Sequence, residues 1–259
     1  MELIDYQLLE SRKDALKAQW LAAKPFHYVV FENFFKPEAA ELILQHYPDV
    51  TQQGWEHTTY INQKNKFVMT EFEPGSILQQ TFDELNGKKL LTIVEYITGI
   101  QDLIADPQLF GGGLHQSTKG AFLDVHVDFN YHPQTHYHRR MNILVYMNKD
   151  WKPEYNGYLE LWDMSTKKQI EYIEPKFNRC VIFETNEISF HGHPKPLNTP
   201  PHVSRKSIAA YYYTKTRPES EIAADHNTIY VNTEGAQGLV KNFLSGIKAL
   251  GERIKNKIN

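Results

Sequence analysis

Short runs in which apolar residues alternate with polar residues, or follow one another directly, occupy the middle of the chain. Gly, Pro and Asn separate these runs at intervals of roughly 8–15 residues, a spacing typical of an antiparallel sandwich or barrel. The predicted strands are FLDVHVDF, RMNILVYMN, GYLELWD, KQIEYIEP, RCVIFET, ISFHGH and KSIAAYYYT. This pattern predicts a β-rich core over residues 106–216.

Helical patterns flank the core on both sides. Before it, the sequence predicts helices at 8–24, 37–47, 77–85 and 88–98, and a strand at 26–35. After it, residues 236–259 place apolar side chains on one helical stripe, which we expect to dock on its own domain. The basic polar face of this helix leaves contact with an anionic surface as an alternative.

Neither an internal repeat nor a linker interrupts the chain, so we expect a single domain over residues 1–259. Residues 1–105 would be a helix-rich support, residues 106–216 the β core, and residues 217–259 a tail with the amphipathic helix. The expected fold class is therefore α+β with a mainly β core.

Composition narrows the class of protein. The chain has 259 residues, 41% of them hydrophobic and 23% charged, as in an ordinary soluble globular protein. Its net charge of −3 argues against a nucleic-acid partner. The single cysteine, Cys180, excludes a disulfide framework and a thiolate metal cluster. Without a signal-peptide pattern or a long apolar run, we expect a cytoplasmic protein with no membrane span.

His126 and Asp128 lie two residues apart in AFLDVHVDFN, a run of alternating apolar and polar residues. Residues i and i+2 of a strand share a face. The pair alone is weak evidence, because a chain with 12 histidines is expected to contain roughly 0.5 such pairs by chance. The alternative to a metal site is a polar face that contacts water.

A third ligand would strengthen the metal hypothesis. A facial Fe(II) site needs two imidazoles and one carboxylate, with three coordination positions left open. His126 and Asp128 would supply two of these ligands, and the distant run ISFHGHP offers His191 or His193 for the third. Both histidines have the same strand parity, so alternation does not choose between them.

A carboxylate-binding group is predicted nearby. In SRKSIAAYYYT, Arg205 and Ser207 share one face of a strand, and a guanidinium can hold a carboxylate through two hydrogen bonds. In RRMNILVYMNKDW, strict alternation places Tyr146 on one face together with Arg140, Asn142 and Leu144. The Tyr146 phenol could therefore join the same carboxylate.

In this order, these stretches resemble the 2-oxoglutarate- and Fe(II)-dependent oxygenases of the prolyl 4-hydroxylase type. The resemblance covers about residues 111–216. It implies a double-stranded β-helix, or jelly roll, with the metal inside its open end. It also implies that His126, Asp128 and His191 are the metal ligands and catalytic residues, His191 being preferred to His193.

The resemblance assigns the cosubstrate contacts as well. Arg205 would form a salt bridge with the C5 carboxylate of 2-oxoglutarate, although it follows His191 by 14 residues, more than the common spacing. Tyr146 would donate to the same carboxylate, Ser207 would be a third donor, and Asn142 or Gln116 would reach the C1 end. Gly54–Glu71 is a candidate substrate lid.

The resemblance implies an enzyme that uses Fe(II), 2-oxoglutarate and O₂, with ascorbate as a candidate reductant. We expect hydroxylation of an aliphatic C–H bond of a small molecule or a carrier-tethered residue, with release of succinate and CO₂. The alternatives are a peptidyl prolyl or other protein hydroxylase and, from another class, a non-catalytic metal-containing jelly-roll binding module. Desaturation and ring closure are further alternatives. They differ from hydroxylation in how the substrate is positioned, which no sequence motif indicates.

Overall fold

The structure is a computed structural model that describes residues 2–231 and 233. The predicted amphipathic helix at 236–259 lies outside the described residues. In the part of the chain that is described, no helix is both long enough and apolar enough to cross a bilayer.

The described residues form helices and strands in the order that the sequence predicts, with additions. The helices are α1 (Tyr6–Ala22), α2 (Pro37–Gln45), α3 (Ile77–Leu85) and α4 (Lys88–Thr98). The strands are β1 (Tyr28–Glu32), β2 (Glu56–Tyr60), β3 (Gln63–Met69), β4 (Ile104–Ala105), β5 (Gly113–Val127), β6 (His138–Tyr146), β7 (Leu159–Asp163), β8 (Lys168–Ile173), β9 (Arg179–Glu184), β10 (Phe190–His193), β11 (Arg205–Thr214) and β12 (Ile229–Tyr230).

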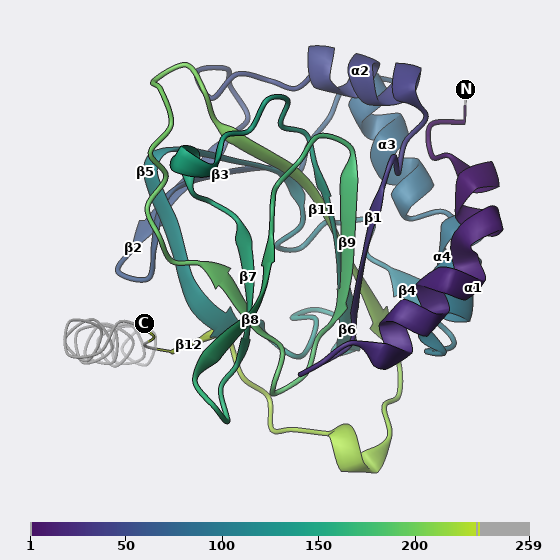
Figure 1. Ribbon diagram of the computed structural model, residues 1–259. Helices are drawn as coiled ribbons and strands as arrows, with labels where there is room; N and C mark the ends of the chain where they lie inside the picture. The colour runs from purple at the N-terminus through teal and green to yellow at the C-terminus, as the bar shows by residue number, and fades with distance from the viewer. Residues whose placement is uncertain (1, 232, 234–259) are drawn as a thin grey trace, which may run out of the picture.

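The strands form one curled antiparallel sheet (Figure 1). The main path runs β1-β9-β6-β11-β5-β10-β7-β8. The first part of β5 pairs with β11, whereas its last part pairs with β10, so the long strand bends from one side of the fold to the other. The sheet is a jelly-roll-like half-barrel, and the α+β class predicted from the sequence is confirmed.

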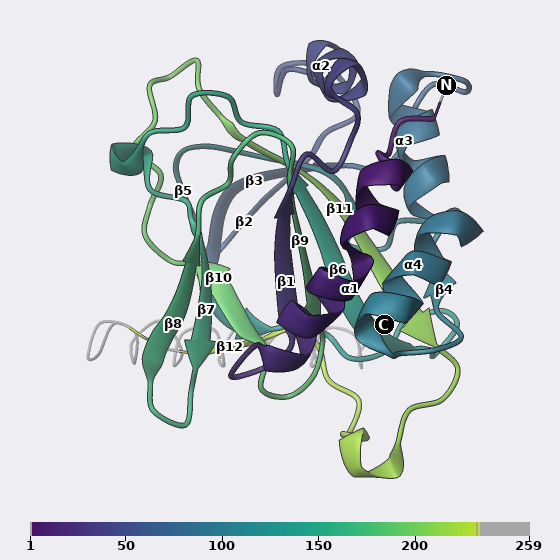
Figure 2. The ribbon, with the colours of Figure 1, turned by 45° about the vertical axis from the view of Figure 1, so that its right-hand side comes forward.

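The helices cover the convex face of this sheet (Figure 2). Leu9, Leu16 and Trp20 of α1 are buried at helical spacing, as an amphipathic helix requires. They belong to the same apolar cluster as Ile143 of β6 and Ile208 of β11. The helices cover the convex face, so the concave face of the sheet, together with β7, β8 and β10, surrounds the interior of the half-barrel.

All seven strands predicted for the core are present, as β5 to β11. The hairpin of β2 and β3 was not predicted, and β5 begins well before the alternating run. The segment 54–71, predicted as a lid, contains this hairpin, and β3 pairs with β5 along most of its length. This segment is therefore part of the sheet.

A β-bulge in β6 changes which arginine faces the interior. The register between β11 and β6 shifts between Tyr212 and Tyr213, which pair with Met141 and Arg139 respectively. Such a bulge interrupts alternation and re-aims the side chains beside it. Arg139 consequently contacts Asp128, while Arg140, which the sequence pattern placed with Asn142, lines a separate cavity on the helix side of the sheet.

A second irregularity lies inside β5. Opposite β10, Leu123 pairs with His193 and His126 pairs with His191, so β5 has one more residue than β10 in this interval. An odd number of extra residues exchanges the two faces of a strand. The even-numbered His126 and the odd-numbered His115 and Ser117 therefore line one pocket.

Gly113 is required where β5 begins. Its φ is +102°, and a Cβ built at this position would lie 2.3 Å from the backbone oxygen of Met69 in β3. We expect Gly113→Ala to lower the free energy of unfolding by about 2 kcal/mol or more, from backbone strain together with the clash. Urea denaturation measures this effect. Gly75→Ala is the matched control, because Gly75 has φ +76° with open space around it, and equal losses would contradict the clash.

Candidate metal centre and cosubstrate pocket

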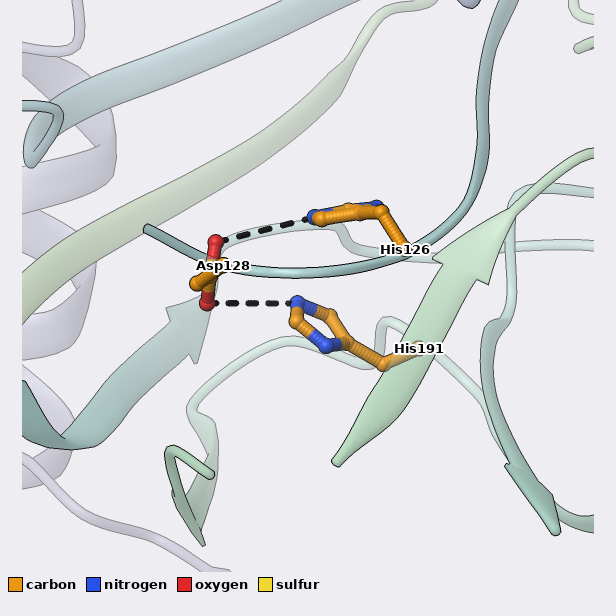
Figure 3. Close-up of side chains that lie close together, drawn as sticks. All are labelled: His126, Asp128 and His191. Atoms are coloured by element: carbon orange, nitrogen blue, oxygen red, sulfur yellow. Dashed lines mark ion pairs between the residues drawn. The ribbon is translucent and has the colours of Figure 1, made fainter. Parts of the chain in front are cut away.

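His126, Asp128 and His191 converge in the interior of the half-barrel (Figure 3). One potential ligand atom from each residue lies within 4.8 Å of the other two. His126 is in β5, Asp128 follows the end of that strand, and His191 in β10 pairs directly with His126. The sheet register therefore brings the distant His191 to the neighbouring His126 and Asp128.

Backbone carbonyls orient both imidazoles. His126 Nδ1 lies 2.8 Å from the carbonyl oxygen of Asp124, and His191 Nδ1 lies 2.9 Å from that of Ser189. A neutral imidazole that donates from Nδ1 keeps its lone pair on Nε2, the usual arrangement for a metal-binding histidine. The two Nε2 atoms lie 3.6 Å and 3.7 Å from the oxygens of Asp128. All three potential ligand atoms are thus directed at a common point.

Arg139 and Asn142 hold the Asp128 carboxylate. Oδ2 of Asp128 accepts a hydrogen bond of 2.7 Å from Asn142 Nδ2 and lies 3.0 Å from Arg139 Nη2. Burial would raise the pKa of Asp128, but the Arg139 guanidinium, together with the two imidazoles, outweighs it and holds this pKa well below its ordinary value. The carboxylate is therefore ionised at neutral pH, as a metal ligand must be.

Burial lowers the pKa of the His191 imidazole to about 4, because it disfavours the charged form. His191 is accordingly neutral at pH 7 and available to a metal. His193 lies in the same strand, pairs with Leu123 and is not part of the convergent group. The structure thus brings the predicted ligand His191, rather than the alternative His193, to His126 and Asp128.

Arg139 is a positioning residue whose loss should weaken metal binding. The guanidinium is 1% exposed, lies over the Phe129 and Tyr211 rings, and donates to Asn142 as well as pairing with Asp128. Removing such a partner of a ligand commonly reduces metal affinity about 10- to 100-fold. We expect this range for Arg139→Met, measured as the Kd for Mn(II).

Arg140→Met is the matched control for this experiment. Arg140 is the adjacent residue, but it pairs with Glu221 on the helix side of the sheet. The Mn(II) affinity of this variant should equal that of the wild type. An equal effect of the two substitutions would contradict the role of the bulge in aiming Arg139.

Arg205 lines the pocket that contains the three convergent residues. Its guanidinium is buried, donating through Nε to the carbonyl oxygen of Gly157 at 2.6 Å and through Nη2 to the hydroxyl of Tyr146 at 3.3 Å. Among the described residues, no carboxylate forms an ion pair with it. A bound acidic ligand would supply the ion-pair partner that this buried cation lacks.

The other predicted cosubstrate residues have different outcomes. Ser207 lines the pocket, and Tyr146 contacts Arg205. Asn142 also lines the pocket, although its amide is bonded to Asp128 and Arg139. Gln116 is buried but does not line the pocket that the described residues form, because the extra residue of β5 opposite β10 places its neighbours His115 and Ser117 there instead.

Sequence reasoning missed three residues of the site. Strict alternation places Arg140 rather than Arg139 with Asn142, because it does not foresee the bulge in β6 that brings Arg139 to Asp128. His115 and Lys66 also line the pocket, but the strands that carry them were not predicted. Patterns in Gly113–Gly120 and in the hairpin are too polar to give a strand signal of their own.

A jelly-roll half-barrel with two imidazoles and a carboxylate at its centre is the fold and donor set of a non-haem iron oxygenase. The comparison with protein families agrees: residues 112–213 match the 2OG-Fe(II) oxygenase superfamily. This part of the chain, the core of the half-barrel, therefore belongs to that superfamily.

Solved structures share the fold over most of the chain. A prolyl hydroxylase from Trichoplax adhaerens, in complex with a hypoxia inducible factor peptide fragment, superimposes with a TM-score of 0.59 and 16% identity, covering 80% of this chain and 91% of its own. A prolyl-4-hydroxylase from Pseudomonas putida gives a TM-score of 0.56 and 16% identity over 77% of this chain and 98% of its own. At these identities the likeness establishes the fold alone.

A curated relative is similar over a shorter stretch. Prolyl 3-hydroxylase OGFOD1 of Mus musculus is 28% identical over 108 residues. The match covers 36% of this chain and 19% of the mouse protein. The similarity is thus local to one segment of each protein.

The superfamily and the triad imply Fe(II) and 2-oxoglutarate, and the residues present fit both. Two neutral imidazoles and an ionised carboxylate are suitable ligands for Fe(II). The buried Arg205 guanidinium, without an acidic partner among the described residues, suits the far carboxylate of a dicarboxylic keto acid. The chain carries an intact His-Asp-His metal site of a 2OG-Fe(II) oxygenase.

Proposed function

We propose that this protein is an Fe(II)- and 2-oxoglutarate-dependent dioxygenase that hydroxylates an aliphatic C–H bond of a small molecule or a carrier-tethered residue. Succinate and CO₂ would be released from the cosubstrate. The observation that carries this proposal is the convergence of His126, Asp128 and His191 beside a buried guanidinium.

In this proposal each residue has a defined task. Nε2 of His126 and of His191, with a carboxylate oxygen of Asp128, would hold the metal. Arg205, Tyr146 and Ser207 would hold the C5 carboxylate of 2-oxoglutarate. Asn142 positions Asp128 through a hydrogen bond.

Bound Fe(II) would supply the redox chemistry that activates O₂ as the keto acid is decarboxylated. The protein residues fix geometry and exclude water. Leu123, Leu144, Leu159 and Phe183 line the pocket between the charged groups. Apolar walls of this kind keep water away from a reactive centre, which protects the oxidation from side reactions.

A peptidyl prolyl or other protein hydroxylase is the second candidate, and the size of the pocket favours it over hydroxylation of a free small molecule. The cavity formed by the described residues has a volume of about 90 Å³, below the roughly 300–1,000 Å³ of pockets for drug-sized ligands. The body of a substrate would therefore stay at the mouth and insert only the group that reacts. A protruding residue of a peptide and a group on a carrier arm both meet this condition.

Succinate formation tests the proposed function. The Fe(II)-loaded protein should convert 2-oxoglutarate to succinate, and the correct substrate should stimulate the conversion. Amino acids, carrier-tethered residues and prolyl peptides presented in parallel separate the two candidates by which class stimulates turnover. Absence of succinate with every class, at any Fe(II) concentration, would favour a non-catalytic metal-binding module.

A further inference from the structure

Lys66 lies in the metal pocket without a partner that accounts for its charge. It belongs to β3, outside the segment matched by the superfamily, and lines the same cavity as Arg205, His115 and His193. Among the described residues, no hydrogen bond and no ion pair involves its ammonium group. Asp128 is the one acidic side chain among the described residues that line the cavity, and it is already paired with Arg139.

The strand register places Lys66 and Arg205 on either side of one serine. Ser117 of β5 pairs with Lys66 of β3 on one side and with Arg205 of β11 on the other. Residues opposite one another in antiparallel strands project from the same face of the sheet. Because adjacent strands lie about 4.8 Å apart, the backbones of Lys66 and Arg205 are roughly 10 Å apart, with Ser117 between them.

The neighbouring row supplies further polar groups. Ser207 of β11 pairs with Tyr146 on one side and with His115 on the other. From β10, His193 also reaches the cavity, and its Nδ1 is buried without a hydrogen-bond partner among the described residues. The cavity is therefore lined by two cations, two serine hydroxyls and an imidazole nitrogen without a hydrogen-bond partner among the described residues. Such a lining favours the binding of an anion.

We infer that Lys66 is a second cationic residue for the far carboxylate of the keto-acid cosubstrate, which it would bind from β3 while Arg205 binds from β11. This inference rests on the proposed function. Burial lowers the pKa of Lys66 to about 8, so the amine is still mostly protonated at neutral pH and can donate to a carboxylate. The two cations would thereby select a dicarboxylic over a monocarboxylic keto acid.

Binding in the absence of turnover tests the inference. The Kd for 2-oxoglutarate would be measured by calorimetry on the Mn(II)-loaded protein, wild type and Lys66→Met. We expect the substitution to weaken binding about tenfold or more, as for other hydrogen bonds to charged groups. Lys66→Arg should recover most of the affinity, because it restores the positive charge.

A keto acid without the far carboxylate distinguishes direct contact from a change in the fold. Lys66→Met should leave the affinity for 2-oxopentanoate, which has a methyl group in place of this carboxylate, unchanged. Lys64→Met is the matched control: Lys64 is exposed on the same strand, and its replacement should alter neither affinity.

Three outcomes would overturn the inference. If Lys66→Met binds 2-oxoglutarate as tightly as the wild type, Lys66 does not contact the cosubstrate. Lys66 would then be assigned to binding an acidic primary substrate instead. Equal weakening for both keto acids would show a general disturbance of the pocket. A wild-type protein that binds Mn(II) but no 2-oxoglutarate would overturn the proposed function together with this inference.

Discussion

Asp128→Ala and His126→Ala are each expected to reduce succinate formation roughly 10³-fold or more, a change of about 4 kcal/mol in the activation barrier. Each substitution removes one ligand from a facial site that has only three. In Asp128→Ala the loss is compounded, because Arg139 is left as a buried cation without its partner. Succinate production and Fe(II) affinity should fall together.

His202→Ala is the control for these variants, because His202 is an exposed histidine in the loop before β11. Its turnover should equal that of the wild type. Retention of Fe(II)-dependent turnover by both ligand variants would show that the convergent group is not the catalytic centre. Circular dichroism of each variant confirms that the fold is intact before activity is compared.

The same metal-binding measurement decides between the two histidines of β10. His191→Ala should lose Fe(II), since its Nε2 faces Asp128 at 3.7 Å. His193→Ala should retain Fe(II), because His193 is outside the group of convergent atoms. The reverse result would mean that His193 is the third ligand.

Arg205→Ala should raise the concentration of 2-oxoglutarate needed for half-maximal turnover on the order of 100-fold. Truncating one partner of a buried charged pair costs roughly 2–5 kcal/mol of binding free energy, and about 1.4 kcal/mol corresponds to tenfold. The guanidinium also donates to Gly157 and Tyr146, so the variant disturbs the groups that surround the carboxylate. Steady-state kinetics with varied 2-oxoglutarate measures the effect.

Lys206→Ala is the corresponding control. Lys206 follows Arg205 but donates to Ser204 and does not line the cavity that the described residues form. An unchanged 2-oxoglutarate requirement for Arg205→Ala, or an equal increase for Lys206→Ala, would contradict the assignment of Arg205 as the carboxylate-binding residue.

The sequence predicted the helices and strands well wherever the pattern of apolar and polar residues was regular. The helices α1 to α4 and the strands β5 to β11 arise from periodic apolar residues, and their burial in one core explains why those patterns were sufficient. His126, Asp128 and His191 were also predicted, because two ligands share a strand and the third follows a recognisable run. Their mutual proximity required the β5–β10 register, which no local pattern contains.

What the sequence did not predict depends on irregular pairing. Arg139 reaches Asp128 only because a bulge interrupts β6, and Gln116 does not line the pocket because β5 has one extra residue between Leu123 and His126. Lys66 was overlooked for a different reason. Its strand is held by hydrogen bonds to β5 rather than by its own apolar periodicity.

The one additional residue of β5, between Leu123 and His126, has a consequence for how this protein can vary over evolutionary time. This residue connects two halves of one strand whose inward faces are out of phase, with His126 in one half and Ser117 in the other. Gain or loss of a single residue between them would restore uniform parity and rotate one half outward. Chain length in this short interval is therefore under as strict a constraint as the identity of any side chain in the pocket, and tolerated insertions would come in pairs.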